Sequence, residues 1–352
     1  MSQMLVPKSR IPWRHFVLFG WMPSPLKRWA YRTFLGYRIG RGVTFAPGAV
    51  VVGDHVELGD HVEIGLLAVV QGKSIRIGRH SSVGTFSYVS CETIDIGEDA
   101  RIREQVYVGG PQLPESRFTL GNRTIVLQMA FINPTKPVTI GDDTGIGGHC
   151  LIFTHGAWLN VLDGYPVTYE PVTLGRSVWL PWRVFIMPGT SIGDGTVIGA
   201  NSLVSGVIPP NSLAVGSPAK VIRRAPEFPL TISPERRSEL IAGMMREFDR
   251  YVTHAGVMIS EASPFRLYAR DHAVHRLLWA HESIVLPDVG LAAGDTVFTD
   301  TALSGSVIAL LRSRGVHWLD LNGRSRSRAG SALTEELAQF LGRYGIRLVR
   351  DG

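Results

Sequence analysis

The chain has 352 residues, of which 45% are hydrophobic and 19% are charged. This composition is that of a folded protein with a sizeable core, and the length favours two domains, or one long domain with an appendage. The 39 glycines favour a turn-rich β architecture. The two cysteines, Cys91 and Cys150, exclude a disulfide framework and favour a reducing compartment.

The first 53 residues are strongly basic. They contain eight Lys or Arg residues and no Asp or Glu, so they carry +8 and the remaining residues −2, which sum to the net +6. The apolar run Phe16–Met22 lies in this segment. It is far shorter than the roughly 20 apolar residues of a transmembrane helix, it lacks a signal-peptide cleavage pattern, and no other stretch can span a bilayer. Ser24 and Pro25 predict the cap and the first residue of a short basic helix.

Two compatible interpretations of residues 1–38 stay open. In the first, this basic amphipathic segment lies on an anionic membrane surface, held by its charges and by burial of Phe16, Phe19 or Trp21. In the second, its apolar side packs against the next domain as a cap.

A repeat begins at residue 39. Ile or Leu followed by Gly recurs at Ile39, Leu58, Ile77, Ile96, Leu120, Ile140, Leu174 and Ile192, and the first three steps are 19 residues each. Between these anchors an apolar residue recurs every six residues, which fits neither a helix nor an ordinary strand. Three short strands around a narrow core explain this period, and each coil of about 18 residues stacks on the next at about 4.8 Å. The sequence therefore predicts a parallel β-helix of about eight coils.

Two breaks interrupt the repeat. After Val108 one coil is lengthened to 24 residues, and the interval from Ile140 to Leu174 is 34 residues long, about 15 more than the standard 19. The surplus lies at residues 155–171 and begins with His155. Long insertions in a regular scaffold usually carry function.

The run "PVTLGRSVWLPWRVFIMPGTSIGDGTVIGANSLVSGVIPPNSLAVGSPAKVIRR" from Pro171 to Arg224 resembles the galactoside, maltose and xenobiotic acetyltransferases of the hexapeptide-repeat family. The style of the chain is closest to the bacterial polysaccharide-modifying O-acetyltransferases. The resemblance implies a left-handed parallel β-helix over residues 39–224, although right-handed crossovers are the general rule.

The resemblance also implies a chemistry. An acyl group, most simply acetyl from acetyl-CoA, passes to a hydroxyl of a sugar in a surface polysaccharide or its precursor. His155 would act as the general base, a backbone N–H would stabilise the oxyanion, and Asp163 or Glu170 would fix the histidine tautomer. Neither cysteine is placed to act as a nucleophile, and no metal is expected.

Matching the motifs position by position gives candidate coenzyme-binding residues, which are Trp182, Arg183, Ala200, Ser205, Lys220 and Arg223. Three positions depart from the family pattern. Pro181 stands where glycine is usual and removes a backbone donor, Trp182 stands where a small residue is usual, and Ser205-Gly206 stands where Thr-Lys is usual. These departures motivate an alternative from another class, a non-catalytic β-helix that serves as a scaffold.

Other histidines receive no role. His55, His61 and His80 are expected at exposed turns, and His149 precedes His155 by six residues. The related γ-class carbonic anhydrases bind zinc through three histidines on this fold, but their spacing differs from that in this chain.

Residues 225–352 predict a C-terminal helical and α/β module. A helix capped by Ser233, with Pro234 inside its start, comes first. The segments "SIVLP", "DTVFTD", "VIALLRSRG", "VHWLDL", "LTEELAQFLGRYG" and "IRLVR" follow. "RSRSR" at 324–328 is either a solvated turn or a ligand site.

The resemblance finally implies partners. We expect a saccharide acceptor, no nucleic acid, and a homotrimer in which Trp158, Leu159 and Tyr165 of the inserted loop cover a groove on the next subunit. The expected location is cytoplasmic, with the membrane interpretation adding a peripheral position at the inner face of the cell membrane.

Overall fold

The structure, a computed structural model, describes residues 12–111, 113–280 and 289–351. The chain folds into two compact units, Met1–Thr231 and Ile232–Gly352. The first unit holds the β-helix together with the segment expected at 1–38, and the second holds the C-terminal module. None of the described helices is long and apolar enough to cross a membrane.

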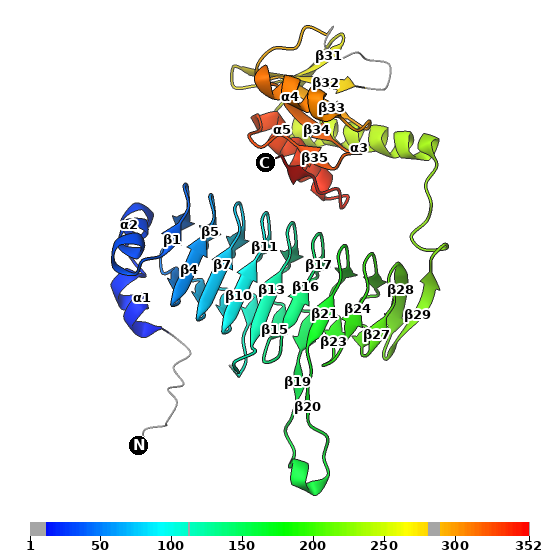
Figure 1. The fold of residues 1–352 in the computed structure, drawn as a ribbon. Helices are drawn as coiled ribbons and strands as arrows, with labels where there is room; N and C mark the ends of the chain where they lie inside the picture. The colour runs from blue at the N-terminus through cyan, green and yellow to red at the C-terminus, as the bar shows by residue number, and fades with distance from the viewer. Residues whose placement is uncertain (1–11, 112, 281–288, 352) are drawn as a thin grey trace. The chain divides into compact units, whose positions relative to one another are not determined.

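Three sheets form the faces of the β-helix (Figure 1). The first sheet contains β1 (Arg38–Ile39), β4 (His55–Leu58), β7 (Ser74–Ile77), β10 (Thr93–Ile96), β13 (Arg117–Leu120), β16 (Val138–Ile140), β21 (Val172–Leu174), β24 (Ser191–Ile192) and β27 (Val207–Ile208). The second contains β2 (Thr44–Phe45), β5 (Glu63–Ile64), β8 (Ser82–Val83), β11 (Arg101–Ile102), β14 (Ile125–Val126), β17 (Gly145–Ile146), β22 (Trp179–Leu180), β25 (Val197–Ile198), β28 (Ser212–Gly216) and β29 (Ala219–Arg224). The third contains β3 (Val50–Val52), β6 (Val69–Gln71), β9 (Tyr88–Ser90), β12 (Tyr107–Val108), β15 (Phe131–Asn133), β18 (Leu151–Phe153), β23 (Phe185–Ile186) and β26 (Leu203–Val204).

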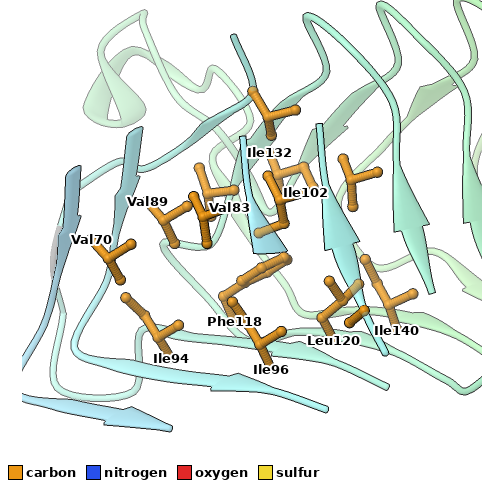
Figure 2. Close-up of a cluster of buried hydrophobic side chains, with 14 of the residues drawn as sticks. Val70, Val83, Val89, Ile94, Ile96, Ile102, Phe118, Leu120, Ile132 and Ile140 are labelled. Carbon is orange, nitrogen blue, oxygen red and sulfur yellow. The ribbon is translucent and has the colours of Figure 1, made fainter. Parts of the chain in front are cut away.

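One strand from each sheet makes one coil, so these strands form eight complete coils and a partial ninth. Neighbouring strands pair in parallel, except that β28 and β29 close the helix as an antiparallel hairpin. The predicted left-handed parallel β-helix with an extruded loop is confirmed. Anchor residues such as Ile96, Leu120 and Ile140 point into a single narrow core, as Figure 2 shows.

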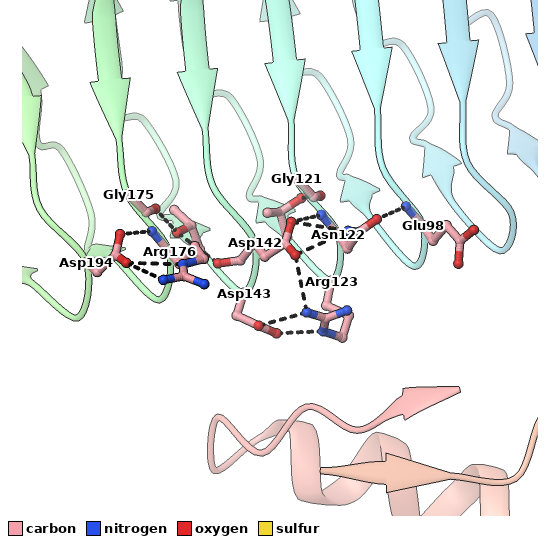
Figure 3. Close-up of polar contacts among 11 residues, drawn as sticks. Glu98, Gly121, Asn122, Arg123, Asp142, Asp143, Gly175, Arg176 and Asp194 are labelled. Carbon is pink, nitrogen blue, oxygen red and sulfur yellow. Dashed lines mark hydrogen bonds and ion pairs between the residues drawn. The ribbon is translucent and has the colours of Figure 1, made fainter. Parts of the chain in front are cut away.

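We name the three edges of the prism by the order in which the chain passes them. The first edge joins the first sheet to the second, the second edge joins the second to the third, and the third edge returns to the first sheet. Polar side chains line the first edge (Figure 3). There Asp142 accepts a hydrogen bond from the backbone N–H of Asn122 in the previous coil, at 2.7 Å, and Asp194 does the same for Arg176, at 2.8 Å.

Helices α1 (Trp13–Phe19) and α2 (Ser24–Phe34) pack on the first coil. Phe19 and Tyr31 are buried in the same core as the coils, with ring centroids 5.2 Å apart. The prediction that Ser24 caps α2 is wrong. Ser24 is the first helical residue, and its hydroxyl oxygen instead accepts a hydrogen bond from the N–H of Phe45 at 3.0 Å, which ties the helix to the first coil.

Basic residues of α2 point toward the end of the β-helix. Lys27 is fully buried and donates to the carbonyls of Gly20 and Ala49 at 3.0 and 2.7 Å. Arg28 donates to Val43 O at 2.8 Å, and Arg32 donates to Ile39 O. These cations satisfy carbonyl groups at the end of the coil stack, so α2 caps the β-helix.

The second unit is a seven-stranded sheet in the order β30 (Met258–Ala262), β31 (Phe265–Arg270), β32 (Ala273–Ala280), β33 (Thr296–Thr299), β34 (His317–Asp320), β35 (Ser325–Arg326) and β36 (Val349–Arg350). Its helices are α3 (Pro234–His254), α4 (Gly305–Ser313) and α5 (Ala332–Gly342). The Ser233 cap is confirmed, since its side chain accepts from the N–H of Arg236. The sequence missed β30–β32, and the expected strand "SIVLP" lies outside the described residues.

In the basic 324–328 turn, Arg326 is buried and forms an ion pair with Glu335 at 2.9 Å. Arg350 also pairs with Glu335, at 3.0 Å. Arg326 therefore has a structural role inside the unit, and the expectation of a fully solvated turn is wrong at this residue.

Candidate functional site

The inserted loop leaves the prism at the third edge, directly after β18 (Figure 1). It starts as a two-stranded antiparallel arm, in which β19 (His155–Gly156) pairs with β20 (Thr168–Tyr169). A short 3₁₀ helix, Val161–Asp163, forms the tip, and Asn160 caps it by accepting from the N–H of Leu162. The arm residues between the two strands are exposed, and the indole of Trp158 is 96% exposed.

His155 lies at the base of this arm and is half-buried. Its ring stacks on that of its cross-strand partner Tyr169, with centroids 5.6 Å apart, and the ring of Phe153 lies 6.4 Å away. The Nδ1 atom is buried and has no hydrogen-bond partner among the described residues. Since an unsatisfied buried polar atom costs about 1–3 kcal/mol, this nitrogen is unusual in a folded chain.

Neither of the two carboxylates considered as partners of His155 hydrogen-bonds to its imidazole. Asp163 is at the tip of the arm, in the 3₁₀ helix. Glu170 follows β20, and its backbone N–H donates to Thr154 O at 3.0 Å. The Glu170 carboxylate lies against Gly189, where a Cβ would be 2.0 Å from Oε2.

Three candidate coenzyme-binding residues gather at the second edge. Trp182 and Arg183 precede β23, and Ala200 precedes β26 one coil further on. The side chains of all three are exposed. The N–H of Asn201 donates to Trp182 O at 3.1 Å, which joins the two turns. Ala200 therefore leaves room beside the indole and the guanidinium.

Trp182 also covers the preceding coil. A Cβ on Gly148 would lie 2.2 Å from the indole ring, so glycine is required beneath it. The His149 ring lies 5.7 Å from that of Trp182. Gly148 and Trp182 are 34 positions apart, the same interval as Ile140 and Leu174, so they occupy equivalent positions in neighbouring coils.

Pro181 interrupts the ladder of the second sheet. The equivalent residues Gly147 and Gly199 donate to Leu180 O and Ala214 O at 2.6 and 2.8 Å. Pro181 has no N–H to donate to Ile198 O. The β22–β25 pairing accordingly covers a single residue pair, Trp179 with Val197, whereas the β17–β22 pairing covers two.

The remaining candidates are divided between edges. Lys220 and Arg223 are exposed on β29, opposite Val215 and Leu213 of β28, in the hairpin that ends the second sheet. Ser205 follows β26 and so lies at the third edge, the edge that carries His155. Within one chain, the third sheet separates His155 from the Trp182 edge.

The described histidines form no metal site, because no group of three or more possible ligands occurs among the described residues. His61 and His80 occupy turns of the first edge and stack with centroids 5.0 Å apart. His55 is exposed as expected but begins strand β4, so its placement in a turn is wrong.

No family model matches the chain. The curated proteins that match part of it are named as acetyltransferases. Galactoside O-acetyltransferase of Escherichia coli (strain K12) is 40% identical over 96 residues, which are 24% of this chain and 43% of that protein. The putative lipopolysaccharide biosynthesis O-acetyl transferase WbbJ of the same strain is 39% identical over 100 residues, 25% of this chain and 51% of that protein. The chain is similar to the hexapeptide-repeat acetyltransferases.

The matched part of these acetyltransferases is limited. The match spans between about a quarter and a half of the length of these relatives. A crystal structure of a hexapeptide-repeat containing acetyltransferase from Vibrio cholerae overlaps 60% of this chain and 86% of that chain, with 20% identity and a TM-score of 0.29.

Proposed function

We propose that this protein is a coenzyme A-dependent O-acetyltransferase with His155 as its general base. The observation that carries the proposal is the half-buried histidine at the base of an exposed arm, on a β-helix whose sequence is similar to galactoside O-acetyltransferase. The acceptor is a sugar hydroxyl of a surface polysaccharide or its lipid-linked precursor. The similarity to an O-acetyl transferase of lipopolysaccharide biosynthesis supports this class. The proposed location is cytoplasmic, at the inner face of the cell membrane.

In this mechanism His155 Nε2 takes the proton of the acceptor hydroxyl as its oxygen bonds to the thioester carbonyl carbon. The carbon–sulfur bond then breaks, and the imidazolium returns the proton to the departing thiolate. Tyr169 limits rotation of the imidazole by stacking on it. The coenzyme lies along Trp182, Arg183 and Ala200, and Arg183 supplies charge for its phosphates in place of the lysine that the sequence lacks.

The proposed oligomer is a trimer, which rests on the resemblance to the hexapeptide-repeat acetyltransferases. The two halves of the site lie at opposite edges of the third sheet within one chain, so a neighbouring copy is needed to bring them together. A second copy would bring its second edge to the His155 edge of the first. The exposed arm residues Trp158, Leu159 and Tyr165 would be covered by that contact.

The test is acetyl transfer from acetyl-CoA to a panel of sugar acceptors. General bases contribute roughly 10²–10⁴ in rate, so His155→Ala should lower kcat by at least about 10². The control is His55→Ala, which removes an exposed imidazole on β4. If His155→Ala lowers kcat by less than about threefold, His155 is not the general base.

Pro181 and Trp182 favour an alternative function, a β-helix scaffold without catalytic activity. Both residues differ from the glycine and the small residue that are usual at these coenzyme-binding positions. Calorimetric titration of the full chain with coenzyme A separates the two functions. Failure to bind at millimolar coenzyme would favour the scaffold, and saturable binding would favour the transferase.

A further inference from the structure

The outward side of the N-terminal cap is apolar and aromatic. We call this the N-terminal apolar surface, and its exposed side chains are Trp13, Val17, Leu18, Trp21, Leu26, Trp29 and Phe34. Trp21 is 65% exposed and Trp29 is 54% exposed. Phe16 joins the rings of Trp13 and Trp21 at centroid distances of 6.2 and 5.9 Å, and the rings of Trp29 and Phe34 are 5.3 Å apart.

Helix α2 is apolar on its outward side as well as on the side that buries Ala30 and Tyr31 in the core. A helix on a folded core normally buries its apolar stripe and turns its charges to water. In α2 the amine of Lys27 is buried on carbonyls of Gly20 and Ala49, whereas Leu26 and Trp29 face outward. Exposed apolar clusters of this kind on one folded element mark an interaction site.

The chemistry of the surface selects its occupant. Indole rings prefer the region between lipid headgroups and acyl chains, where an apolar body and a polar N–H are both accommodated. Helices α1 and α2 have 7 and 11 residues, too few to cross a bilayer that needs roughly 20. The surface belongs to the first 53 residues, which carry eight cations and no acidic residue. Charge complementarity therefore favours anionic lipid over a second copy of the same cationic segment.

We infer that the N-terminal apolar surface docks into the headgroup region of an anionic phospholipid bilayer. Burial of the outward aromatic and aliphatic side chains would supply most of the binding, and the exposed Arg14 would add attraction to anionic headgroups. Lys27, Arg28 and Arg32 donate hydrogen bonds to carbonyls of the first unit but keep their charge, so they add to the attraction at a distance rather than through headgroup contacts. The inference is independent of acetyl transfer, because it holds for any chemistry at the His155 edge.

The test uses the full chain and sedimentation with vesicles of phosphatidylcholine containing phosphatidylglycerol, next to vesicles of phosphatidylcholine alone. The variant Trp21→Gln/Leu26→Gln/Trp29→Gln replaces three exposed side chains and so should leave the fold intact. Its control is Leu230→Gln/Ile232→Gln/Val274→Gln, which replaces three side chains of comparable exposure elsewhere. Melting temperature, sedimentation velocity and coenzyme A titration are measured on all three proteins.

We expect wild type and control to pellet with anionic vesicles, and the surface variant to partition at least tenfold more weakly with unchanged melting and unchanged oligomeric state. Raising salt from about 0.1 to 1 M should weaken wild-type binding less than the three substitutions do, because salt screens only the charge contribution. The inference is overturned if wild type stays in the supernatant at millimolar lipid, or if the variant pellets as wild type does. A variant that changes only the oligomeric state would assign the surface to a second copy. Coenzyme A binding reports on the proposed transferase separately from either result.

Discussion

Lys27 shows how a charged residue is used inside the N-terminal cap. Its Nζ atom is held by two backbone carbonyls and lies 5.5 Å from the centre of the Phe45 ring. Burial lowers the pKa of this amine from 10.5 to about 8, because the charged form loses its water. The cap therefore gains two hydrogen bonds to carbonyls while the desolvated charge opposes folding.

This pKa predicts how stability depends on pH. The unfolded chain binds the Lys27 proton more tightly than the folded chain does, so between pH 8 and 10.5 the unfolded state carries more protons. The free energy of unfolding contributed by this group therefore rises with pH across that window, and its unfavourable effect is fully present below pH 8. Lys27→Met removes the titration. We expect the difference in melting temperature between wild type and variant to change between pH 8 and 10.5.

The control for this prediction is Lys73→Met, which removes an exposed amine. Its melting temperature should differ from that of wild type by the same amount at every pH. If the Lys27→Met and wild-type curves also run parallel from pH 7 to 11, the amine does not titrate in the predicted window.

Trp182 is one of the residues proposed to line the coenzyme path. The indole is 49% exposed at the second edge, beside Ala200 in the next turn. Stacking of a purine base on an aromatic ring is worth about 1–3 kcal/mol. Trp182→Ala should therefore weaken coenzyme A binding by at least about fivefold in a calorimetric titration.

Trp29→Ala is the matched control, since it removes an equally exposed indole from the N-terminal apolar surface. Its coenzyme A affinity should equal that of wild type. Tighter binding by Trp182→Ala would mean that the indole obstructs the coenzyme path rather than lining it.

At the scale of the elements, the polar first edge keeps neighbouring coils in register (Figure 3). Asp142 accepts from the backbone N–H of Asn122 in one coil, and Asn122 accepts from that of Glu98 in the coil before it, at 2.8 Å. Both an aspartate and an asparagine serve as acceptors, so the side-chain oxygen rather than the negative charge holds neighbouring coils together here.

Asp142→Ala should therefore lower the free energy of unfolding by about 1 kcal/mol, because it leaves the N–H of Asn122 without its acceptor. Asp142→Asn keeps an acceptor oxygen and should lose less than half as much. Urea unfolding of the full chain measures both variants, provided the slope with denaturant is unchanged. Equal losses in the two variants would assign the effect to the carboxylate charge and its contact with Arg123 at 3.6 Å.

Sequence reasoning succeeded where a local pattern repeats and missed what depends on distant contacts. Anchors such as Ile77 and Ile96 predict coils, because each position points into the same core. The antiparallel strands of Met258–Ala280 were missed, since their burial does not alternate strictly and no Asn-Gly or Asp-Gly turn joins them. The burial of Lys27 was not predicted, because a sequence does not show the carbonyls that lie within its reach.

In the candidate site, the sequence predicted the position of His155 but not the side-chain contacts around it. His155 was found because the repeat fails there, and the arm confirms that an insertion begins at this residue. The position of Glu170 against Gly189, the stacking of Tyr169 on His155 and the packing of Trp182 on Gly148 all require the register of one coil on the next. The 34-residue interval from Ile140 to Leu174 indicates which residues stack on each other, but it does not show how closely their side chains pack.

At the scale of the whole molecule, the third sheet determines how a site can be assembled. Its parallel strands begin at the Trp182 edge and end at the His155 edge, so both edges of one chain point away from each other across the sheet. A closed ring of three copies would place the His155 edge of each copy against the Trp182 edge of the next. Light scattering should then give about 116 kDa, three times the 38.6 kDa of one chain.

A shared site makes a prediction that mass alone does not test. His155→Ala removes the base at one edge, and Ala200→Trp places an indole where the coenzyme would approach the other edge. Each variant should be inactive by itself. When both are co-expressed in equal amounts and assemble at random, about a quarter of the sites pair an intact His155 edge with an intact Ala200 edge. Acetyl transfer should therefore recover to about a quarter of the wild-type rate per chain. If each site lay within one chain, every chain would carry one defect, and co-expression would restore no activity.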